Sequence, residues 1–323
     1  MKTRMTDLLG IKYPIMCGGM LWLCKPALCA AVSNAGGLGN VTAGNYDSGE
    51  ELRKAIRMTK ELTDKPFGIN ITLMPSFRIS ENTYNDYFQV CCEEQVAAIE
   101  VSGTPAKKYI AMVHEAGIKI MHKVGAVRHA VNCQKLGYDA VFAAGIEEGG
   151  HPLNDDVSTM VLTPRIVETV NIPVITTGGI ADGRGLAAAL SLGADGVMMA
   201  TRFIATRECT VHQKIKEEIL ARQENETSLI TKSIGLQGRA LINDLVKQIL
   251  EIEERGDTEE LWPLLLGQRA KQAWQTGDVD SAAFYVGQSI GLVNNVLSCK
   301  ELLDGMVEQA QKVLKNSLDK LRA

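Results

Sequence analysis

One stretch of the chain, residues 173–203, constrains the fold more than any other. It begins with an apolar, β-branched run that ends at Gly178 and Gly179, and it closes with a second apolar run that ends before Thr201. An alanine- and leucine-rich segment lies between the two runs, directly after Asp182, a residue typical of a helix N-cap. The order is therefore strand, glycine turn, helix and strand within about thirty residues, which is the length of one βαβ unit.

The same stretch also predicts a site for an anion. Gly178 and Gly179 let a ligand approach the backbone N–H groups after the first strand, and Thr201 can donate its hydroxyl to the same anion. In (β/α)8 barrels, the loops after strands seven and eight form such a phosphate site. We therefore expect six further strands upstream.

Six upstream runs fit this expectation, covering residues 13–19, 37–43, 66–72, 96–103, 118–124 and 139–145. Between them, apolar residues recur at spacings of three and four, which predicts helices over residues 27–35, 49–62, 105–116, 127–136 and 159–170. Alternating strands and helices indicate parallel β/α units, and eight such units close a barrel. The predicted fold class is α/β, with a (β/α)8 TIM barrel over residues 1–210.

The pattern changes after residue 210, where strand signals become few. Helical spacing predicts helices over residues 211–222, 241–254, 261–274, 282–296 and 300–321. We expect a smaller helical second domain over residues 211–299. The C-terminal helix, residues 300–323, is expected to pack back on the barrel, because each barrel strand needs an outer helix.

Charge and composition argue against several classes of partner. A net charge of −4 and a pI near 5.8 provide no basic face for nucleic acid. No apolar run reaches the length of a membrane span and the first twenty or so residues lack a signal-peptide core, so we expect no membrane partner and a cytoplasmic location. The eight cysteines include no Cys-x-x-Cys pair, which argues against a disulfide framework or a zinc site.

Active sites of such barrels lie at the C-terminal ends of the strands. The candidates there are Cys17 to Met20, Asn70, His122, Lys123, Glu147 to His151, Gly178, Gly179, Ala200 and Thr201. His151 ends a glycine-rich turn, and an imidazole that titrates near neutrality suits proton transfer. No histidine pair has the spacing of a zinc motif, so we expect no metal site.

Two local questions stay open in the sequence. His122 and Lys123 are neighbours on a strand, so only one of them can point into the barrel. Glu147 and Glu148 could form a paired carboxylate site, or they could be turn residues that orient or flank His151.

A long connection follows the third predicted strand, over residues 73–87. It fits either a surface loop with a turn at Pro75 or a lid over the site. A glycine-rich run at residues 34–39 lies between a helix and the next strand, which is the wrong order for a dinucleotide fingerprint. A nicotinamide cofactor would therefore bind transiently.

Several motifs together resemble the nitronate monooxygenase superfamily of FMN-dependent TIM-barrel enzymes. They occupy residues 14–20, 34–39, 66–70, 149–151, 178–185 and 200–203, and the resemblance extends over essentially the whole chain, including residues 277–280. The superfamily includes nitronate monooxygenases (2-nitropropane dioxygenases), FMN-type enoyl-ACP reductases and NADH:quinone reductases. The segments most similar to the quinone-reductase type are residues 127–130, 155–156 with 162–164, 206–209 and 267–269.

The resemblance implies roles for individual residues. Gly18, Gly19 and Met20 would line the isoalloxazine of FMN, and Asn70 and Lys123 would hydrogen-bond to it. The implied phosphate site is Gly178, Gly179, Ala200 and Thr201, and Gly150 would contact the cofactor beside His151, the implied catalytic residue. The chain departs from the family's usual residues at Cys17, Ala144 and Ala200.

The resemblance implies an FMN oxidoreductase in which NAD(P)H, a transient co-substrate, reduces FMN and the flavin then reduces a quinone-like acceptor. The alternatives are oxidation of alkyl nitronates with O2 and reduction of an enoyl thioester. A flavin-free barrel isomerase or lyase acting on a sugar phosphate, and a non-catalytic binding protein, are the alternatives from other classes. The expected partner is a small-molecule substrate, with a homodimer as a candidate assembly.

Overall fold

The computed structural model describes residues 1–74 and 78–322, and its centre is a barrel of eight parallel strands. The strand order is β1-β8-β7-β6-β5-β4-β3-β2, and a parallel bridge between Met16 and Leu38 joins β1 to the start of β2. The strands are β1 (Ile15–Cys17), β2 (Gly39–Thr42), β3 (Phe67–Leu73), β4 (Ala98–Gly103), β5 (Lys119–Val124), β6 (Ala140–Ala144), β7 (Val174–Thr177) and β8 (Gly196–Met199). All eight predicted strands and the TIM-barrel fold are confirmed.

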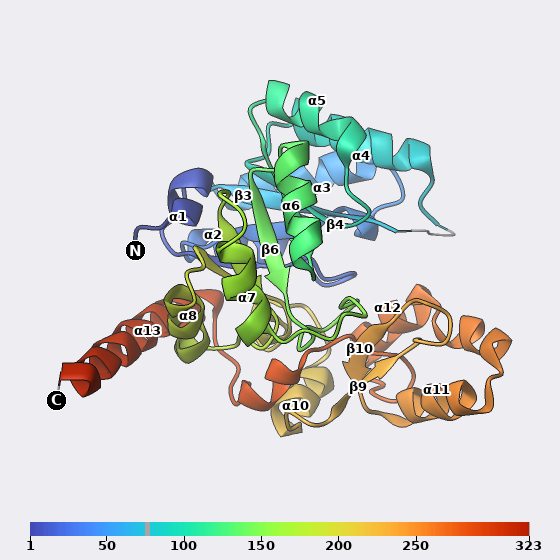
Figure 1. The fold of residues 1–323 in the computed structure, drawn as a ribbon. Coiled ribbons are helices and arrows are strands. Elements are labelled where there is room, and N and C mark those ends of the chain that lie inside the picture. Colours follow the sequence, from blue (N-terminus) through green and yellow to red (C-terminus); the bar gives the residue numbers. More distant parts are fainter. Residues whose placement is uncertain (75–77, 323) are drawn as a thin grey trace.

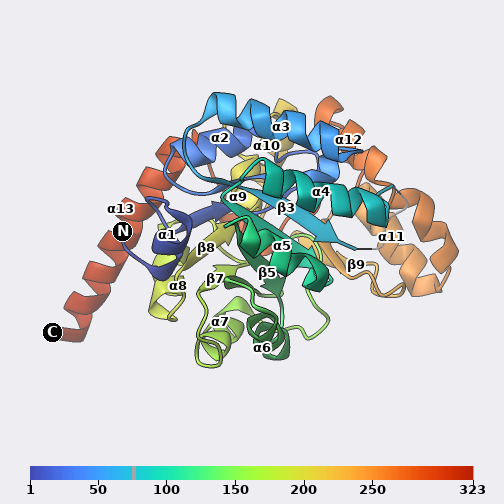
Figure 2. The same ribbon diagram turned by 90° about the horizontal axis from the view of Figure 1, so that it is seen from above.

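Helices cover the outside of the barrel, as the two views at right angles show (Figures 1 and 2). They are α2 (Pro26–Asn34), α3 (Gly49–Leu62), α4 (Glu81–Glu93), α5 (Ile110–Glu115), α6 (Val127–Leu136), α7 (Thr159–Val167) and α8 (Gly183–Ser191), with α1 (Arg4–Leu9) before β1 and short turns η1 (Ala43–Asn45), η2 (Lys107–Tyr109) and α9 (Thr201–Ile204). The predicted N-cap is correct, since the Asp182 carboxylate accepts hydrogen bonds from the backbone N–H groups of Arg184 and Gly185.

The connection expected over residues 73–87 is shorter than predicted. Helix α4 begins inside it, at Glu81, because the Ser80 side chain accepts a hydrogen bond from the backbone N–H of Thr83. Pro75, at which either a turn of a surface loop or a lid was expected, lies outside the described residues.

Alternation along the strands separates two sets of side chains. Inward-facing residues such as Met16, Met121, Phe142 and Met198 form one cluster inside the barrel, whereas outward-facing residues such as Ile120 pack under the helices. The same alternation decides between His122 and Lys123.

Lys123 shares the inward parity of Met121, so its side chain points to the barrel mouth. His122 faces outward, is only 3% exposed and packs its ring 5.1 Å from that of Tyr138. Desolvation by burial, with a smaller effect of Lys123, lowers the pKa of His122 from 6.5 to about 4. The ammonium group of Lys123 therefore points into the barrel, and the imidazole of His122 is buried in the outer core, where its neutral form is favoured.

The region after the barrel strands contains a hairpin as well as helices. Its elements are α10 (Gln213–Ala221), β9 (Thr227–Ile230), β10 (Gly238–Leu241), α11 (Asp244–Arg255), η3 (Thr258–Leu264), α12 (Gly267–Thr276) and η4 (Gln288–Leu292). Strands β9 and β10 are antiparallel, so the expectation of helices alone is wrong here, and Leu241 lies in β10 and not in a helix.

The helix predicted over residues 282–296 is also wrong. This segment is extended apart from η4, because its backbone pairs with other segments. Phe284 accepts a hydrogen bond from Leu241 N–H at 2.9 Å, and Gln288 N–H donates to the Glu147 carbonyl at 3.0 Å. Apolar spacing alone does not reveal such tertiary backbone pairing.

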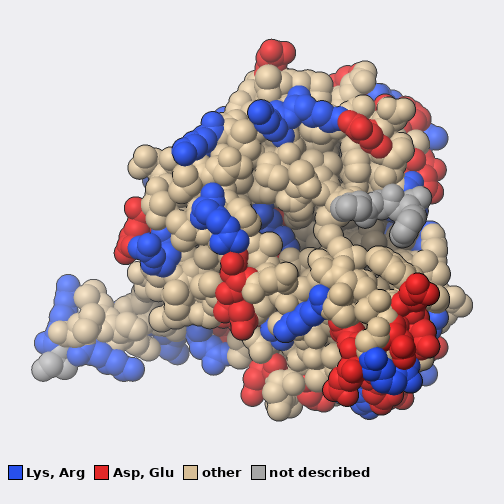
Figure 3. All heavy atoms as spheres, turned by 45° about the vertical axis from the view of Figure 1, so that its right-hand side comes forward, with Lys and Arg blue, Asp and Glu red and all other residues tan. Residues whose placement is uncertain are grey.

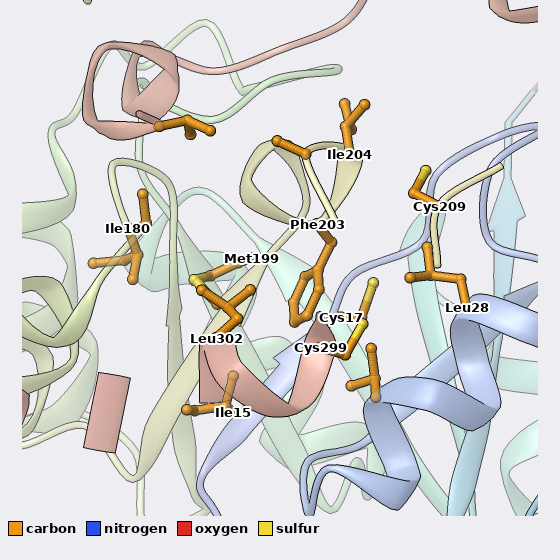
Figure 4. Packing of buried hydrophobic residues seen from close by; sticks show 14 of the residues in the cluster. Ile15, Cys17, Leu28, Ile180, Met199, Phe203, Ile204, Cys209, Cys299 and Leu302 are labelled. Carbon is orange, nitrogen blue, oxygen red and sulfur yellow. The ribbon is translucent and has the colours of Figure 1, made fainter. Parts of the chain in front are cut away.

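The C-terminal helix α13 (Cys299–Arg322) packs on α8 and α2, which confirms that it returns to the barrel. Figure 4 shows its residues Cys299 and Leu302 close to Phe203, beside Cys17 of β1. Gly183 allows the close approach of α8, since a Cβ there would lie 2.3 Å from the Met306 carbonyl oxygen. The outer end of α13 extends past the body of the protein (Figure 1).

We expect the buried part of α13 to hold the barrel closed. Leu303 is fully buried, so Leu303→Ala should destabilise the protein by about 2 to 5 kcal/mol in chemical denaturation. Leu321→Ala, on the same helix at 85% exposure, is the matched control and should change stability little. Equal effects of the two substitutions would contradict this role of the helix.

His122 should make the protein acid-sensitive. The unfolded chain takes up a proton on this residue near pH 6.5 but the folded chain only near pH 4, so stability falls as the pH drops through this window. The loss should approach about 3 kcal/mol, and His122→Phe should remove it. Unfolding of both proteins measured at a series of pH values gives the difference, and parallel curves would refute the assignment.

Candidate active site

A cavity opens at the C-terminal ends of the barrel strands, and seven of the eleven residues with an implied cofactor-binding or catalytic role line it. Its lining combines glycine-rich loops with a few charged and polar side chains. The lining residues are Gly18, Gly19, Glu100, Ser102, Lys123, Glu148, Gly149, Thr177, Gly178, Gly179, Ile180, Met198, Met199, Ala200, Thr201 and Ser289. The predicted residues Met20, Asn70, Gly150 and His151 are not among them.

The loops after β7 and β8 form one side of the cavity. Gly178 and Gly179 have φ angles of 96° and 72°, a conformation that favours glycine. Among the described residues, no group accepts a hydrogen bond from the backbone N–H of Gly178, Gly179 or Thr201. The Thr201 hydroxyl oxygen accepts from Gly287 N–H at 3.0 Å, so its own hydrogen can be donated to a ligand. This arrangement of donors fits an anion such as a phosphate.

The loop after β1 lies next to the loop after β8 and forms the adjoining part of the cavity wall. Gly18 N–H donates to the Met199 carbonyl at 2.8 Å, which fixes the loop to β8. A Cβ on Gly19 would lie 2.1 Å from Asn70 Cγ, so only glycine fits between this loop and β3. Asn70 itself is 3% exposed and lies behind the loop. Met20 is half-buried and packs against the outer core.

Lys123 is the cationic side chain among the residues that line the cavity. Its Nζ lies 3.0 Å from Oε1 of Glu148, which comes from the loop after β6. Burial raises the pKa of Glu148, while the charge of Lys123 opposes that shift. The pair places an ammonium at the centre of the barrel mouth.

Glu100 is a cavity residue that the sequence analysis missed. It lies on β4, faces inward and is 2% exposed, and burial raises the pKa of its carboxyl group. The signal was present, since Glu100 interrupts an otherwise apolar strand with a charge. Ser102 follows it at the same parity, whereas nothing local indicates that Ser289 of η4 reaches the cavity.

Glu147 and Glu148 do not form a paired carboxylate site. The Glu147 carboxylate accepts hydrogen bonds from the backbone N–H and hydroxyl of Thr159, both at 2.9 Å, and so stabilises the start of α7. Glu148 turns instead to Lys123. The two neighbours thus have separate partners.

His151 lies beside the cavity, next to the β9–β10 hairpin. Its Nδ1–H donates to the Gln237 carbonyl at 3.0 Å, and its ring centroid lies 5.2 Å from that of Tyr285. Gly150, which precedes it, pairs with the backbone of Arg239. His151 is exposed, although the groups packed around its ring lower its pKa by desolvation. Because Nδ1 is engaged, Nε2 is the nitrogen available for proton exchange.

The three departures from the family's usual residues lie in different places. Cys17 faces away from the cavity, with its Sγ 3.9 Å from that of Cys24. Ala144, at the end of β6, is 5% exposed and does not line the cavity, whereas Ala200 does.

Two general properties concern the described part of the chain only. Within residues 1–74 and 78–322, no cluster of three or more histidine, cysteine or acidic side chains is arranged to hold a metal ion. In the same residues, every helix is too short or too polar to cross a lipid bilayer.

On the face shown in Figure 3, basic and acidic side chains both occur, with acidic ones gathered at the lower right.

Comparison with known proteins identifies relatives that match this chain over nearly its full length. A 5-hydroxy-7a-methyl-1-oxo-octahydro-1H-indene-4-carboxyl-CoA dehydrogenase of Rhodococcus jostii is 34% identical, covering 100% of this chain and 99% of the relative. A probable nitronate monooxygenase of Staphylococcus saprophyticus is 32% identical, covering 97% and 99%.

Two solved structures are also similar. FabK of Thermotoga maritima has a TM-score of 0.90 at 38% identity, covering 100% of this chain and 99% of FabK. A nitroalkane oxidase of Streptomyces ansochromogenes has a TM-score of 0.82 at 25% identity, covering 98% and 100%. The family model for nitronate monooxygenase matches residues 2–309. The chain therefore belongs to the nitronate monooxygenase family and is an oxidoreductase.

Proposed function

We propose that the chain is an FMN-dependent oxidoreductase in which NAD(P)H reduces the flavin and a quinone-like acceptor reoxidises it. The observation that carries this proposal is the pair of loops after β7 and β8, whose free N–H donors and Thr201 hydroxyl suit a mononucleotide phosphate. Gly18 and Gly19 line the same cavity as Lys123 and carry no side chains, which leaves room for a planar ring.

The residues of the chain would have distinct tasks. When bound, FMN would supply the transfer of two electrons between NAD(P)H and the acceptor. Lys123 would stabilise negative charge that develops on the ring, because an ammonium in a poorly solvated cavity interacts more strongly than in water. His151 would hold the proton for the acceptor at Nε2, with Nδ1 fixed by Gln237. Met20, Asn70 and Gly150 remain in the proposal as residues that bind the cofactor.

A second substrate class has a specific observation in its favour. The Rhodococcus relative is named as a dehydrogenase of a carboxyl-CoA compound, so a thioester is the second candidate substrate. Oxidation of nitronates is the third, on the name of the Staphylococcus relative. All three chemistries would use the same barrel mouth.

A cytoplasmic location, a second domain at residues 211–299 and a homodimer remain parts of the proposal.

Thr201 provides a direct test of the phosphate site. Thr201→Val removes the hydroxyl donor at nearly constant volume, and a hydrogen bond to a charged group contributes about 1.5 to 3 kcal/mol. FMN affinity measured by quenching of flavin fluorescence should fall about ten- to hundredfold. Thr201→Ser keeps the hydroxyl and should bind almost as the parent does. Unchanged affinity in the valine variant would remove this residue from the phosphate site.

The direction of electron flow can be tested in half-reactions. We expect NADH or NADPH to bleach the FMN-loaded protein under anaerobic conditions, after which a quinone should restore the colour. Bleaching by an alkyl nitronate but by neither NADH nor NADPH would refute the reductase proposal. Recovery of colour with an enoyl thioester but not with a quinone would select the second candidate.

His151 should act only in the second half-reaction. His151→Ala should slow reoxidation by the acceptor by about 10²- to 10⁴-fold, the range of general acid catalysis, and leave bleaching by NAD(P)H largely unchanged. His129→Ala, on the barrel surface helix α6, is the control. Reoxidation at the parent rate in the His151 variant would exclude its catalytic role.

A further inference from the structure

The cavity contains one more acid than base. Glu100 and Glu148 flank Lys123, so full ionisation of all three groups leaves a net charge of −1 in a poorly solvated site. The two carboxyl groups are 2% and 7% exposed. A phosphate monoester would add about −1.5 to −2 charges at neutral pH. An anionic ligand and two ionised carboxylates would therefore repel one another in this poorly solvated cavity.

The two carboxyl groups differ in their partners. Glu148 has an ammonium at 3.0 Å, which stabilises its ionised form. Glu100 has no cation within ion-pair distance among the described residues. Its Oε2 accepts from Gly19 N–H at 3.2 Å and from Asn40 Nδ2 at 3.4 Å, and Asn70 adds a side-chain hydrogen bond.

The remaining oxygen of Glu100 can accommodate a proton. Its Oε1 lies 3.1 Å from the Ser102 hydroxyl oxygen, which can accept a hydrogen bond as well as donate one. A neutral Glu100 could therefore donate to Ser102 and still accept from Gly19 at Oε2. The neutral carboxyl group keeps the loop contact without the charge.

Other titratable groups surround this cluster. Glu147 adds negative charge beside Glu148 from the same loop, and Arg239 of β10 faces Glu147. His151 and His122 interact electrostatically with Lys123 from the cavity edge and the outer core. None of these forms a direct hydrogen bond with Glu100 among the described residues. Burial favours the neutral form of Glu100 and outweighs the charge of Lys123 and the hydrogen bonds from its polar neighbours, which favour the ionised form.

We propose that Glu100 is a positioning residue that holds Gly19 as a neutral carboxyl group when FMN is bound, and that binding of the anionic mononucleotide drives the uptake of its proton. The inference rests on the proposed function, since it requires FMN in this cavity. Burial raises the pKa of Glu100 and so favours the same protonation state.

Calorimetry measures the proton directly. FMN is titrated into the apoprotein in buffers of different ionisation enthalpy, at several pH values between about 6 and 9, and the slope of observed against buffer enthalpy gives the number of protons taken up. The number of protons taken up per FMN bound should rise towards one as the pH increases. FMN affinity should weaken by up to about tenfold per pH unit in the same range.

Glu100→Gln imitates the neutral carboxyl group and provides the decisive comparison. The variant should bind FMN at least as tightly as the parent at high pH, with little dependence on pH, and its slope should be smaller than that of the parent by the contribution of Glu100. The difference between the two proteins matters because the FMN phosphate itself titrates near a pKa of about 6. Glu217→Gln, an exposed change of the same charge on α10, should behave as the parent.

The outcomes separate the two proposals. Absence of FMN binding in every protein overturns the proposed function and this inference with it. FMN binding with the same proton uptake in parent and Glu100→Gln, or binding more than tenfold weaker in the variant at pH 7, overturns the inference alone. Infrared difference spectra of the parent provide a check without any variant. Addition of FMN should produce the carbonyl band of a neutral carboxylic acid, and its absence would contradict the proposal.

Discussion

The closure of the parallel barrel between β1 and β8 is the constraint on which the whole site depends. Met16 pairs with Met198 in this register, and Gly18 N–H continues the pairing to the Met199 carbonyl. This hydrogen bond places the loop after β1 directly beside the loop after β8. Gly18 and Ala200, which are about 180 residues apart in the sequence, therefore line the same cavity because the sheet has no edge.

The barrel was predictable because its signals are local. Each β/α unit combines a short apolar strand, a turn and a helix with an apolar face, so the pattern repeats within segments that can be recognised without tertiary information. The place of Gly178 and Gly179 at the cavity was predictable for the same reason, since both follow their strand immediately. Strand parity also predicted that only one of His122 and Lys123 could face inward.

The parts that were not predicted depend on contacts between distant segments. The segment at residues 282–296 is extended because it pairs with β10 and with the loop that contains Glu147. The environment of Glu100 forms only when distant segments come together around it. Gly19 comes from the loop after β1, Asn40 from β2 and Ser102 from β4. The environment of His151 likewise requires the hairpin, whose Gln237 carbonyl fixes the ring.

The orientation of the loop after β1 explains which departures from the family's usual residues the site can tolerate. Cys17 points into the outer core, where its Sγ lies 3.9 Å from that of Cys24, so a change at this position alters packing behind the loop. Gly19 faces the opposite way and has no space for a Cβ because of Asn70. Ala200 lines the cavity, and its methyl group is compatible with a phosphate if the ligand is bound by the neighbouring backbone and by Thr201. A substitution should therefore be tolerated better at Cys17 than at Gly19, where Asn70 leaves no space for a Cβ.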